Sequence, residues 1–234
     1  PGRAAEIIRE GLYRGADGGY LLTDRAFAGA DTLATSYALA TAIKKIGDYD
    51  IIIGGRQAID GDTAQVGPQV AEKLGLTQVT YAEEILNVDE KNRSITVKRH
   101  IDGGVETVEG PLPIVITVNG SAAPCRPRNA KLVMKFKRAL GAQEKAPAPA
   151  CHPEGVSALS YPELYEKRPY LNIPEWSVAD VDGDLAQCGL SGSPTKVKAI
   201  QNIVFQAKES KTLTGSDKDV EDLIVELLAN HTIG

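Results

Sequence analysis

The most constraining feature of this sequence is a short apolar strand that runs into a glycine-rich loop and then into a helix. Residues 50–53, Asp-Ile-Ile-Ile, have the composition of a buried strand, and several glycines follow in residues 54–68. In parallel α/β sheets, ligands bind beyond the carboxyl ends of the strands. Glycines let a backbone approach a ligand closely, and free amides at a helix start bind phosphate oxygens. The segment therefore predicts a nucleotide-binding site.

Helical and extended patterns alternate along the first part of the chain. We predict a helix, a buried strand, a helix and a further strand at residues 4–14, 20–22, 31–46 and 50–53. The inner face of the second helix is expected to carry Leu33, Tyr37, Leu39, Ala40 and Ile43. Because parallel strands need crossover connections, this order predicts an α/β fold with a Rossmann-like, mostly parallel sheet. Such a domain usually begins with a central strand, so we expect an N-terminal strand and helix to be missing.

The pattern changes after a predicted helix at 65–74. Period-two alternation predicts an antiparallel meander, followed by a returning core strand, at 79–89, 94–101, 105–108 and 113–118. We expect a nucleotide-binding domain over 1–144 and a Pro/Ala-rich linker over 145–160. Residues 161–234 are expected to form a C-terminal arm that packs on a partner subunit. The arm should end in a helix from Asp217 to about Ala229, with apolar residues Val220, Leu223, Ile224, Leu227 and Leu228 inward.

Composition excludes several classes of protein. A formal charge of −5 and a pI near 5.3 disfavour nucleic acid as a partner. No run approaches the roughly 18 apolar residues of a membrane span, and the start lacks the apolar core of a signal peptide. We therefore expect a cytoplasmic protein without a membrane span. The cysteines and histidines are too widely spaced to predict a metal site.

The glycine-rich loop offers several groups to an adenine nucleotide. Arg56 can offset phosphate charge, and Asp60 or Asp62 can accept hydrogen bonds from ribose or adenine. Since acids repel phosphates, we place the phosphates at the amides of 63–66. The candidate cofactor-binding residues are Gly55, Arg56, Gln57, Ala58, Ile59, Asp60, Gly61, Asp62, Thr63, Ala64, Gln65 and Val66. The alternative is that residues 60–63 are only a turn and helix cap.

A second helix start is predicted at the same sheet edge. Asp31, Thr32, Thr35 and Ser36 lie there, and their polar side chains are candidates for contacts with a diphosphate or a flavin carbonyl. Threonine at a cap is also common without any ligand. Each segment alone is a weak signal of a ligand site, and the two are more informative as a pair.

Residues 24–36 and 55–68 together closely resemble the β subunit of electron-transfer flavoproteins. The resemblance continues through Val118-Asn119-Gly120 and through residues 190–197. It implies a heterodimer with an α subunit that carries another FAD and embraces the C-terminal arm. It also implies an adenine nucleotide in the 55–66 loop, which is AMP in ordinary members and the ADP half of a second FAD in electron-bifurcating members. Gly61, Thr63, Ala64 and Val66, with residues 31–36, resemble the bifurcating type.

The resemblance implies that, in electron-bifurcating members, NADH gives a hydride to the β-subunit FAD and the two electrons then separate. One goes to ferredoxin or flavodoxin, and the other goes through the α-subunit FAD to an acyl-CoA dehydrogenase or reductase. A non-bifurcating subunit with structural AMP is the alternative, and so is a purely structural subunit. An ATP-using or nucleotide-sensing domain would need a GxxxxGK[ST] or comparable Gly-Ser loop, and the sequence contains neither.

A basic segment covers residues 124–139. It contains Arg126, Arg128, Lys131, Lys135, Lys137 and Arg138 without an acidic residue. A solvated basic helix is one interpretation. The family resemblance instead implies the element that recognises the partner dehydrogenase, with Leu132 as the apolar anchor and Arg128 and Lys131 beside it. Asn129-Ala130 and Val133-Met134 depart from the family pattern.

Overall fold

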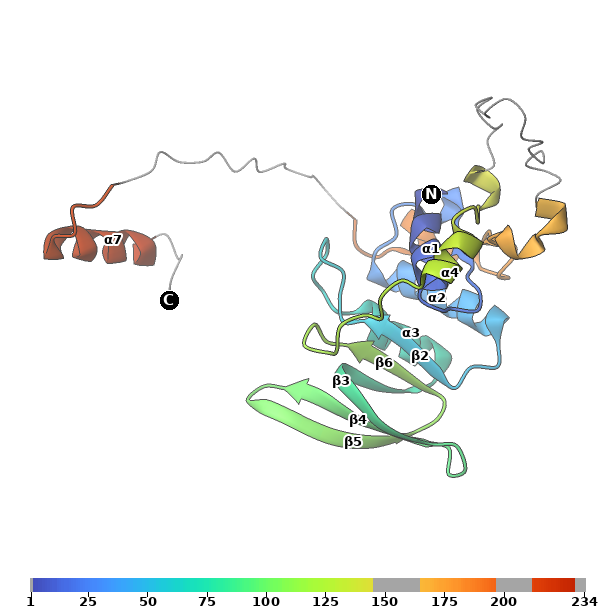
Figure 1. Ribbon diagram of the computed structural model, residues 1–234, viewed down its shortest axis with the longest axis horizontal. Coiled ribbons are helices and arrows are strands. Elements are labelled where there is room, and N and C mark those ends of the chain that lie inside the picture. The colour runs from blue at the N-terminus through green and yellow to red at the C-terminus, as the bar shows by residue number, and fades with distance from the viewer. Residues whose placement is uncertain (1, 145–164, 197–211, 230–234) are drawn as a thin grey trace. The chain divides into compact units, whose positions relative to one another are not determined.

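The protein is a mixed α/β chain in two compact units. The structure, a computed structural model, describes residues 2–144, 165–196 and 212–229. Residues 1–196 form the first unit and residues 197–234 the second. The first contains the sheets, and the second contains helix α7 (Asp217–Ala229) (Figure 1). The predicted linker over 145–160 lies outside the described residues.

The elements of the first unit agree with most of the predicted boundaries. Its helices are α1 (Ala5–Tyr13), α2 (Thr32–Ile46), α3 (Val66–Leu74), α4 (Ala130–Phe136) and α6 (Gly189–Gly192). Its strands are β1 (Leu21–Leu22), β2 (Ile51–Gly55), β3 (Thr77–Asp89), β4 (Ser94–Ile101), β5 (Gly104–Pro111), β6 (Ile114–Val118) and β7 (Glu175–Trp176). Short 3-10 turns occur at η1 (Gly2–Ala4), η2 (Arg25–Phe27), η3 (Ala142–Glu144), η4 (Pro169–Leu171) and η5 (Leu185–Gln187).

The main sheet has the strand order β2-β6-β3-β4-β5 (Figure 1). Strand β6 runs parallel to both β2 and β3, whereas β3, β4 and β5 form an antiparallel meander. This arrangement confirms the predicted fold class. One core belongs to this sheet, and its buried members are Val79, Ala82, Ile95, Val97, Ile114 and Ile116. Helix α3 packs on β6, and α2 packs against α3, so both helix starts lie near the carboxyl edge of the parallel strands.

The predicted strand at 20–22 does not join the main sheet. Strand β1 instead pairs in parallel with β7 to form a separate two-stranded sheet. The Leu21 N–H donates to the carbonyl of Pro174 at 2.8 Å, and the ring of Tyr20 stacks on that of Trp176 with centroids 4.1 Å apart. An apolar run of three residues gives no sign of its partner, so the expectation about sheet membership was wrong.

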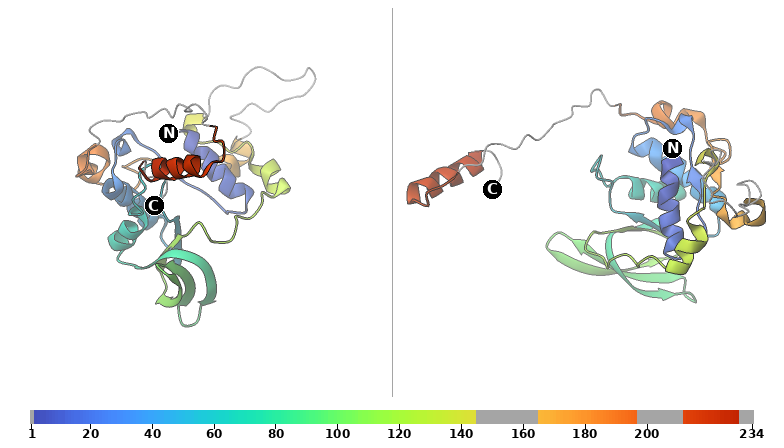
Figure 2. Two further views of the ribbon diagram at one scale, coloured as in Figure 1. Left: turned by 90° about the vertical axis from the view of Figure 1, so that its left-hand side faces the viewer. Right: turned by 45° about the horizontal axis from the view of Figure 1, so that its top comes forward.

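Residues 165–196 pack on their own chain. A second core joins α1, β1, α4 and this segment, and its buried members are Ala5, Leu12, Leu21, Phe136, Ala139, Tyr165, Leu171 and Ile173. Figures 1 and 2 show α1 and α4 side by side in this region. This part of the arm thus buries several side chains within its own chain, and its packing on a partner subunit stays a prediction. Its few periodic signals reflect irregular structure around short 3-10 turns.

The inner face of α2 also differs from the prediction. Leu33 and Leu39 are each 39% exposed, although both were expected to face inward. The buried residues of α2 are small, namely Ala34, Ser36, Ala38, Ala40 and Ala42. Helix α2 contacts both α3 and α6, so its surface is covered from two directions. Small side chains allow this close packing.

Helix α7 carries the predicted apolar residues, but none of its side chains is buried among the described residues. Val220, Ile224 and Leu228 are each nearly half exposed. They recur every four residues and therefore lie along one face. In the described part of the chain, no helix combines the length and the apolar character that crossing a membrane would require.

Candidate functional site

The loop between β2 and α3 begins at the edge of the main sheet. The Arg56 N–H donates to the carbonyl of Val118 at 3.0 Å, which ties the loop to the end of β6. Further along, the Asp62 N–H donates to the carbonyl of Ala58 at 3.1 Å. Asp62 and Ala64 have positive φ angles of 48° and 53°. Non-glycine residues seldom adopt this conformation, and those that do are often found at active sites and ligand-binding loops.

Open space surrounds the backbone of this loop. A Cβ atom placed on Gly54, Gly55 or Gly61 would meet no heavy atom within 4 Å. The Ile59 side chain is 98% exposed, and residues 60–63 are exposed as well. Within the described residues, the chain's own side chains thus leave the loop accessible to a ligand, as a nucleotide site requires.

The start of α3 is suited to an anion. Gln65 occupies the N-cap position, but its side chain makes no capping hydrogen bond among the described residues. The start of α2 differs, because the carboxylate of Asp31 accepts the N–H of Ala34 at 3.0 Å. Uncapped amides and the positive end of the helix dipole both favour negative charge. The predicted phosphate position therefore fits α3 better than α2.

A hydrogen bond joins the two helix starts. The hydroxyl of Thr32 donates to the side-chain carbonyl of Gln65 at 2.8 Å. Thr35 lies one turn into α2, half-buried, and its N–H donates to the carbonyl of Asp31. The structure thus brings together two candidate segments that are separated in the sequence.

Ser36 and Asp31 both have hydrogen-bond partners within the chain. Ser36 is fully buried, and its hydroxyl donates to the carbonyl of Leu33 at 2.8 Å. Asp31 accepts the Thr195 hydroxyl at 2.7 Å and the Thr195 N–H at 3.2 Å. Burial opposes ionisation of Asp31, but the bonds from Ala34 and Thr195 outweigh it and lower the pKa of Asp31 to about 2. These bonds give both side chains structural roles, and their contacts with a cofactor stay predictions.

Sequence reasoning missed residues in the middle of β3 and just after the end of β6. The guanidinium of Arg56 lies 5.5 Å from the ring centroid of Tyr81, which has a φ of 57° in a bulged part of β3. The Ser121 hydroxyl donates to Glu83 at 2.5 Å, and this bond lowers the pKa of Glu83. Alternation along β3 indicated only a strand. The Asn119-Gly120 pair after β6 was the one signal of a turn at this edge.

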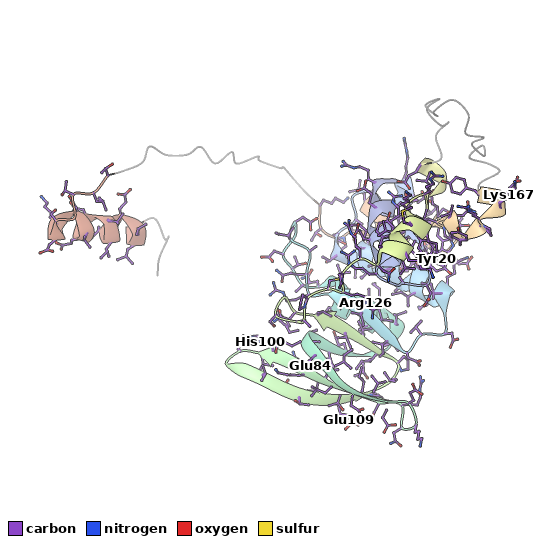
Figure 3. All side chains as sticks on the ribbon, in the orientation of Figure 1. Tyr20, Glu84, His100, Glu109, Arg126 and Lys167 are labelled. Atoms are coloured by element: carbon purple, nitrogen blue, oxygen red, sulfur yellow. The ribbon has the colours of Figure 1, made fainter. Side chains whose placement is uncertain are left out.

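The basic segment before α4 is tied to α1. Arg128 contacts Glu10 through two nitrogens, with Nε to Oε2 at 2.9 Å and Nη2 to Oε1 at 2.6 Å. Arg14 also bonds Glu10, and hydrogen bonds from Arg14 and then Arg128 lower the pKa of Glu10. Figure 3 places Arg126 on the same connection, where its carbonyl accepts the Arg14 Nε–H at 3.0 Å. The charge of Arg128 is therefore partly balanced within the chain.

The predicted apolar anchor is only partly available. Leu132 packs in part against the core formed with α1, whereas Lys131 is exposed beside it. Met134 is 65% exposed on the same short helix. The surface of α4 therefore presents Met134 more fully than Leu132.

The fold and the loop define a Rossmann-like α/β protein with an accessible loop at the carboxyl edge of its parallel strands. The family described as "Electron transfer flavoprotein domain" matches residues 1–147. Protein FixA of Azorhizobium caulinodans is 37% identical over 230 residues, covering 96% of this chain and 70% of the relative. The chain therefore belongs to the electron transfer flavoprotein family.

Two further relatives are named electron transfer flavoprotein subunit beta. The protein from Megasphaera elsdenii is 40% identical over 206 residues, which cover 86% of this chain and 63% of the relative. The one from Clostridium acetobutylicum is 40% identical over 198 residues, covering 85% and 62%. The matched regions span less than two thirds of these two relatives. Together with FixA, they identify a β-type member, and β subunits of this family pair with an α subunit.

Proposed function

We propose that this chain is the β subunit of an electron-bifurcating flavoprotein that binds FAD and takes electrons from NADH. The observation that carries the proposal is the open loop 54–66, which ends at the uncapped start of α3 and is joined to α2 by the Thr32–Gln65 bond. The relatives of the chain support the family, and the bifurcating type rests on the resemblance of Gly61, Thr63, Ala64 and Val66, together with residues 31–36, to such members.

Different residues of the loop would contact different parts of the nucleotide. The amides of 63–66 would hold phosphate oxygens at the start of α3. Asp60 and Asp62 would accept ribose hydroxyls, and Arg56 would offset phosphate charge. Thr32 orients Gln65 at the junction. The flavin, when bound, supplies the redox chemistry, so these residues bind and orient it.

The proposed partners follow from the same assignment. The α subunit would carry the second FAD and receive one electron for an acyl-CoA dehydrogenase or reductase. Ferredoxin or flavodoxin would receive the other electron, in the cytoplasm. The exposed basic residues around Lys131 would face the partner dehydrogenase, because acidic partners are attracted to such a surface.

Cofactor content tests the proposal directly. Acid extraction of the purified heterodimer should release two FAD molecules per complex and no AMP. One FAD with one AMP would reject bifurcation and leave a non-bifurcating carrier, in which AMP occupies the same loop. The complex should also reduce ferredoxin with NADH when the dehydrogenase and its acyl substrate are present. Two FADs without that activity would limit the proposal to cofactor binding.

Substituting Asp62 with Asn should weaken binding of ADP to the cofactor-depleted complex about tenfold, because bonds to a charged acceptor are stronger by about 1 kcal/mol or more. Asparagine tolerates the positive φ of this position, so the backbone should be retained. Titration calorimetry measures the affinity, and Asp102→Asn, on the exposed turn between β4 and β5, is the control. An unchanged Kd would exclude a ribose contact.

A further inference from the structure

A network of hydrogen bonds joins the end of the first unit to the start of α2. The N–H of Asp31 donates to the Ser193 hydroxyl at 2.8 Å, and that hydroxyl donates to the carbonyl of Gly189 at 2.6 Å. The Asp31 carboxylate accepts both the hydroxyl and the N–H of Thr195. Ser193 is 5% exposed, so its own bonds are largely shielded from water, whereas the Thr195 bonds lie at the exposed side of the network. We call Asp31, Ser193 and Thr195 the Asp31 clamp.

Close backbone packing reinforces the clamp. Gly189 has a φ of 52°, and a Cβ there would lie 2.2 Å from the carbonyl oxygen of Ala26 and 2.7 Å from that of Ala28. The N–H of Leu190 donates to the Ala28 carbonyl at 3.2 Å. Only glycine permits this approach. Residues 189–195 are thus held against the loop that precedes α2.

The clamp is connected to the proposed nucleotide loop through two consecutive residues. Asp31 caps α2, and Thr32, the next residue, donates its hydroxyl to Gln65 at the end of the loop. Thr195 is next to Lys196, where the first unit ends and the chain continues into the second. A path of bonds therefore runs from the unit boundary to the start of α3.

We propose that Ser193 and Thr195 are positioning residues for the nucleotide loop and that they act through Asp31 and Thr32. This inference rests on the proposed function, because it concerns the same loop. Loss of a clamp bond frees the start of α2, so Thr32 holds Gln65 less firmly. The amides of 63–66 then lose part of their fixed arrangement, and a ligand must supply the ordering that the clamp now provides.

The test compares Thr195→Val with Thr195→Ser in the full chain co-expressed with its α subunit. Valine removes the hydroxyl and keeps the shape, whereas serine keeps the hydroxyl. ADP binding to the cofactor-depleted complex is measured by calorimetry, and amide hydrogen exchange is measured over residues 63–66. Ser177→Ala is the matched control. It removes a hydroxyl that donates to the Asp180 carboxylate at 2.6 Å, and neither residue belongs to the clamp.

We expect Thr195→Val to weaken ADP binding by about fivefold to tenfold. The lost hydrogen bond is to a charged group, and only part of its energy should reach the nucleotide loop. Exchange over 63–66 should accelerate in Thr195→Val and stay at the wild-type rate in Thr195→Ser and Ser177→Ala. In a Thr32→Val background, the effect of Thr195→Val should shrink, because the path is already broken.

Each outcome decides one of the two proposals. If the wild-type complex fails to bind ADP, the proposed function is lost, and exchange over 63–66 still tests the coupling. If ADP binds and Thr195→Val changes neither Kd nor exchange, the positioning role is overturned. Equal losses in Thr195→Val and Ser177→Ala would also overturn it, since they would reflect general destabilisation.

Discussion

Replacing Ile224 with Asp is expected to abolish assembly with the α subunit. Ile224 lies at the centre of the apolar face of α7, between Val220 and Leu228, and these side chains remain partly exposed in the chain itself. We expect the α subunit to cover this face. A carboxylate buried there without a partner should cost at least about 3 kcal/mol, which weakens association more than about a hundredfold.

Co-purification of the α subunit with a tagged chain measures this effect. Asp222→Ala is the control, because Asp222 lies on the opposite, exposed face of α7. The circular dichroism spectrum of the Ile224→Asp chain should match that of the wild type, since Ile224 contributes no buried side chain to its own fold. Recovery of the α subunit at the wild-type level would show that α7 is not the contact.

Replacing Gly67 with Ala is expected to destabilise the α/β unit and to impair nucleotide binding together. A Cβ at Gly67 would lie 2.3 Å from the Cγ2 methyl of Thr117, which is buried in β6. The first turn of α3 must therefore move away from the sheet. Overpacking of this kind costs about 1–3 kcal/mol, and the displaced turn carries the amides that we assign to phosphate.

A second substitution separates this clash from other effects. Thr117→Ser removes the methyl group and keeps the hydroxyl that accepts the Tyr81 N–H. In the double variant, most of the lost stability and ADP affinity should return, as measured by thermal unfolding and calorimetry. Gly104→Ala is a control, because a Cβ there meets nothing within 4 Å. Absence of rescue would mean that the close contact of α3 with β6 does not govern the loop.

The sequence predicted the parts of the fold that depend on local pattern. The Ile51–Ile53 run, the Asp31 cap and the alternation in the meander each identified an element from neighbouring residues. The parallel part of the sheet followed from the need for crossover connections. The candidate loop was also located from local pattern, because glycines and polar residues follow directly after a buried strand.

The failures involve contacts between residues far apart in the chain. Leu21 and Leu22 pair with β7 across a long stretch of sequence, and no local pattern records that choice. Leu33 was expected to face inward because leucine is apolar. Helix α2 instead packs against both α3 and α6, and its buried positions hold small residues, mostly alanine. The ligand role of Asp31 stays a prediction, but its bonds with Thr195 were missed, because a carboxylate has the same chemistry whether a nucleotide or a threonine donates to it. Only the fold distinguishes those partners.

The position of β6 has a consequence for the growing polypeptide. Strands β2 and β3 do not bond each other, and both take their parallel neighbour from β6, which is synthesised after the whole meander. A nascent chain that has emerged only as far as β3 therefore carries two parallel-strand edges with open amides. Closure of such a sheet is a non-local and slow event. Until Ile114–Val118 leave the ribosome, these edges are the surfaces on which chaperones would act or misassembly would begin.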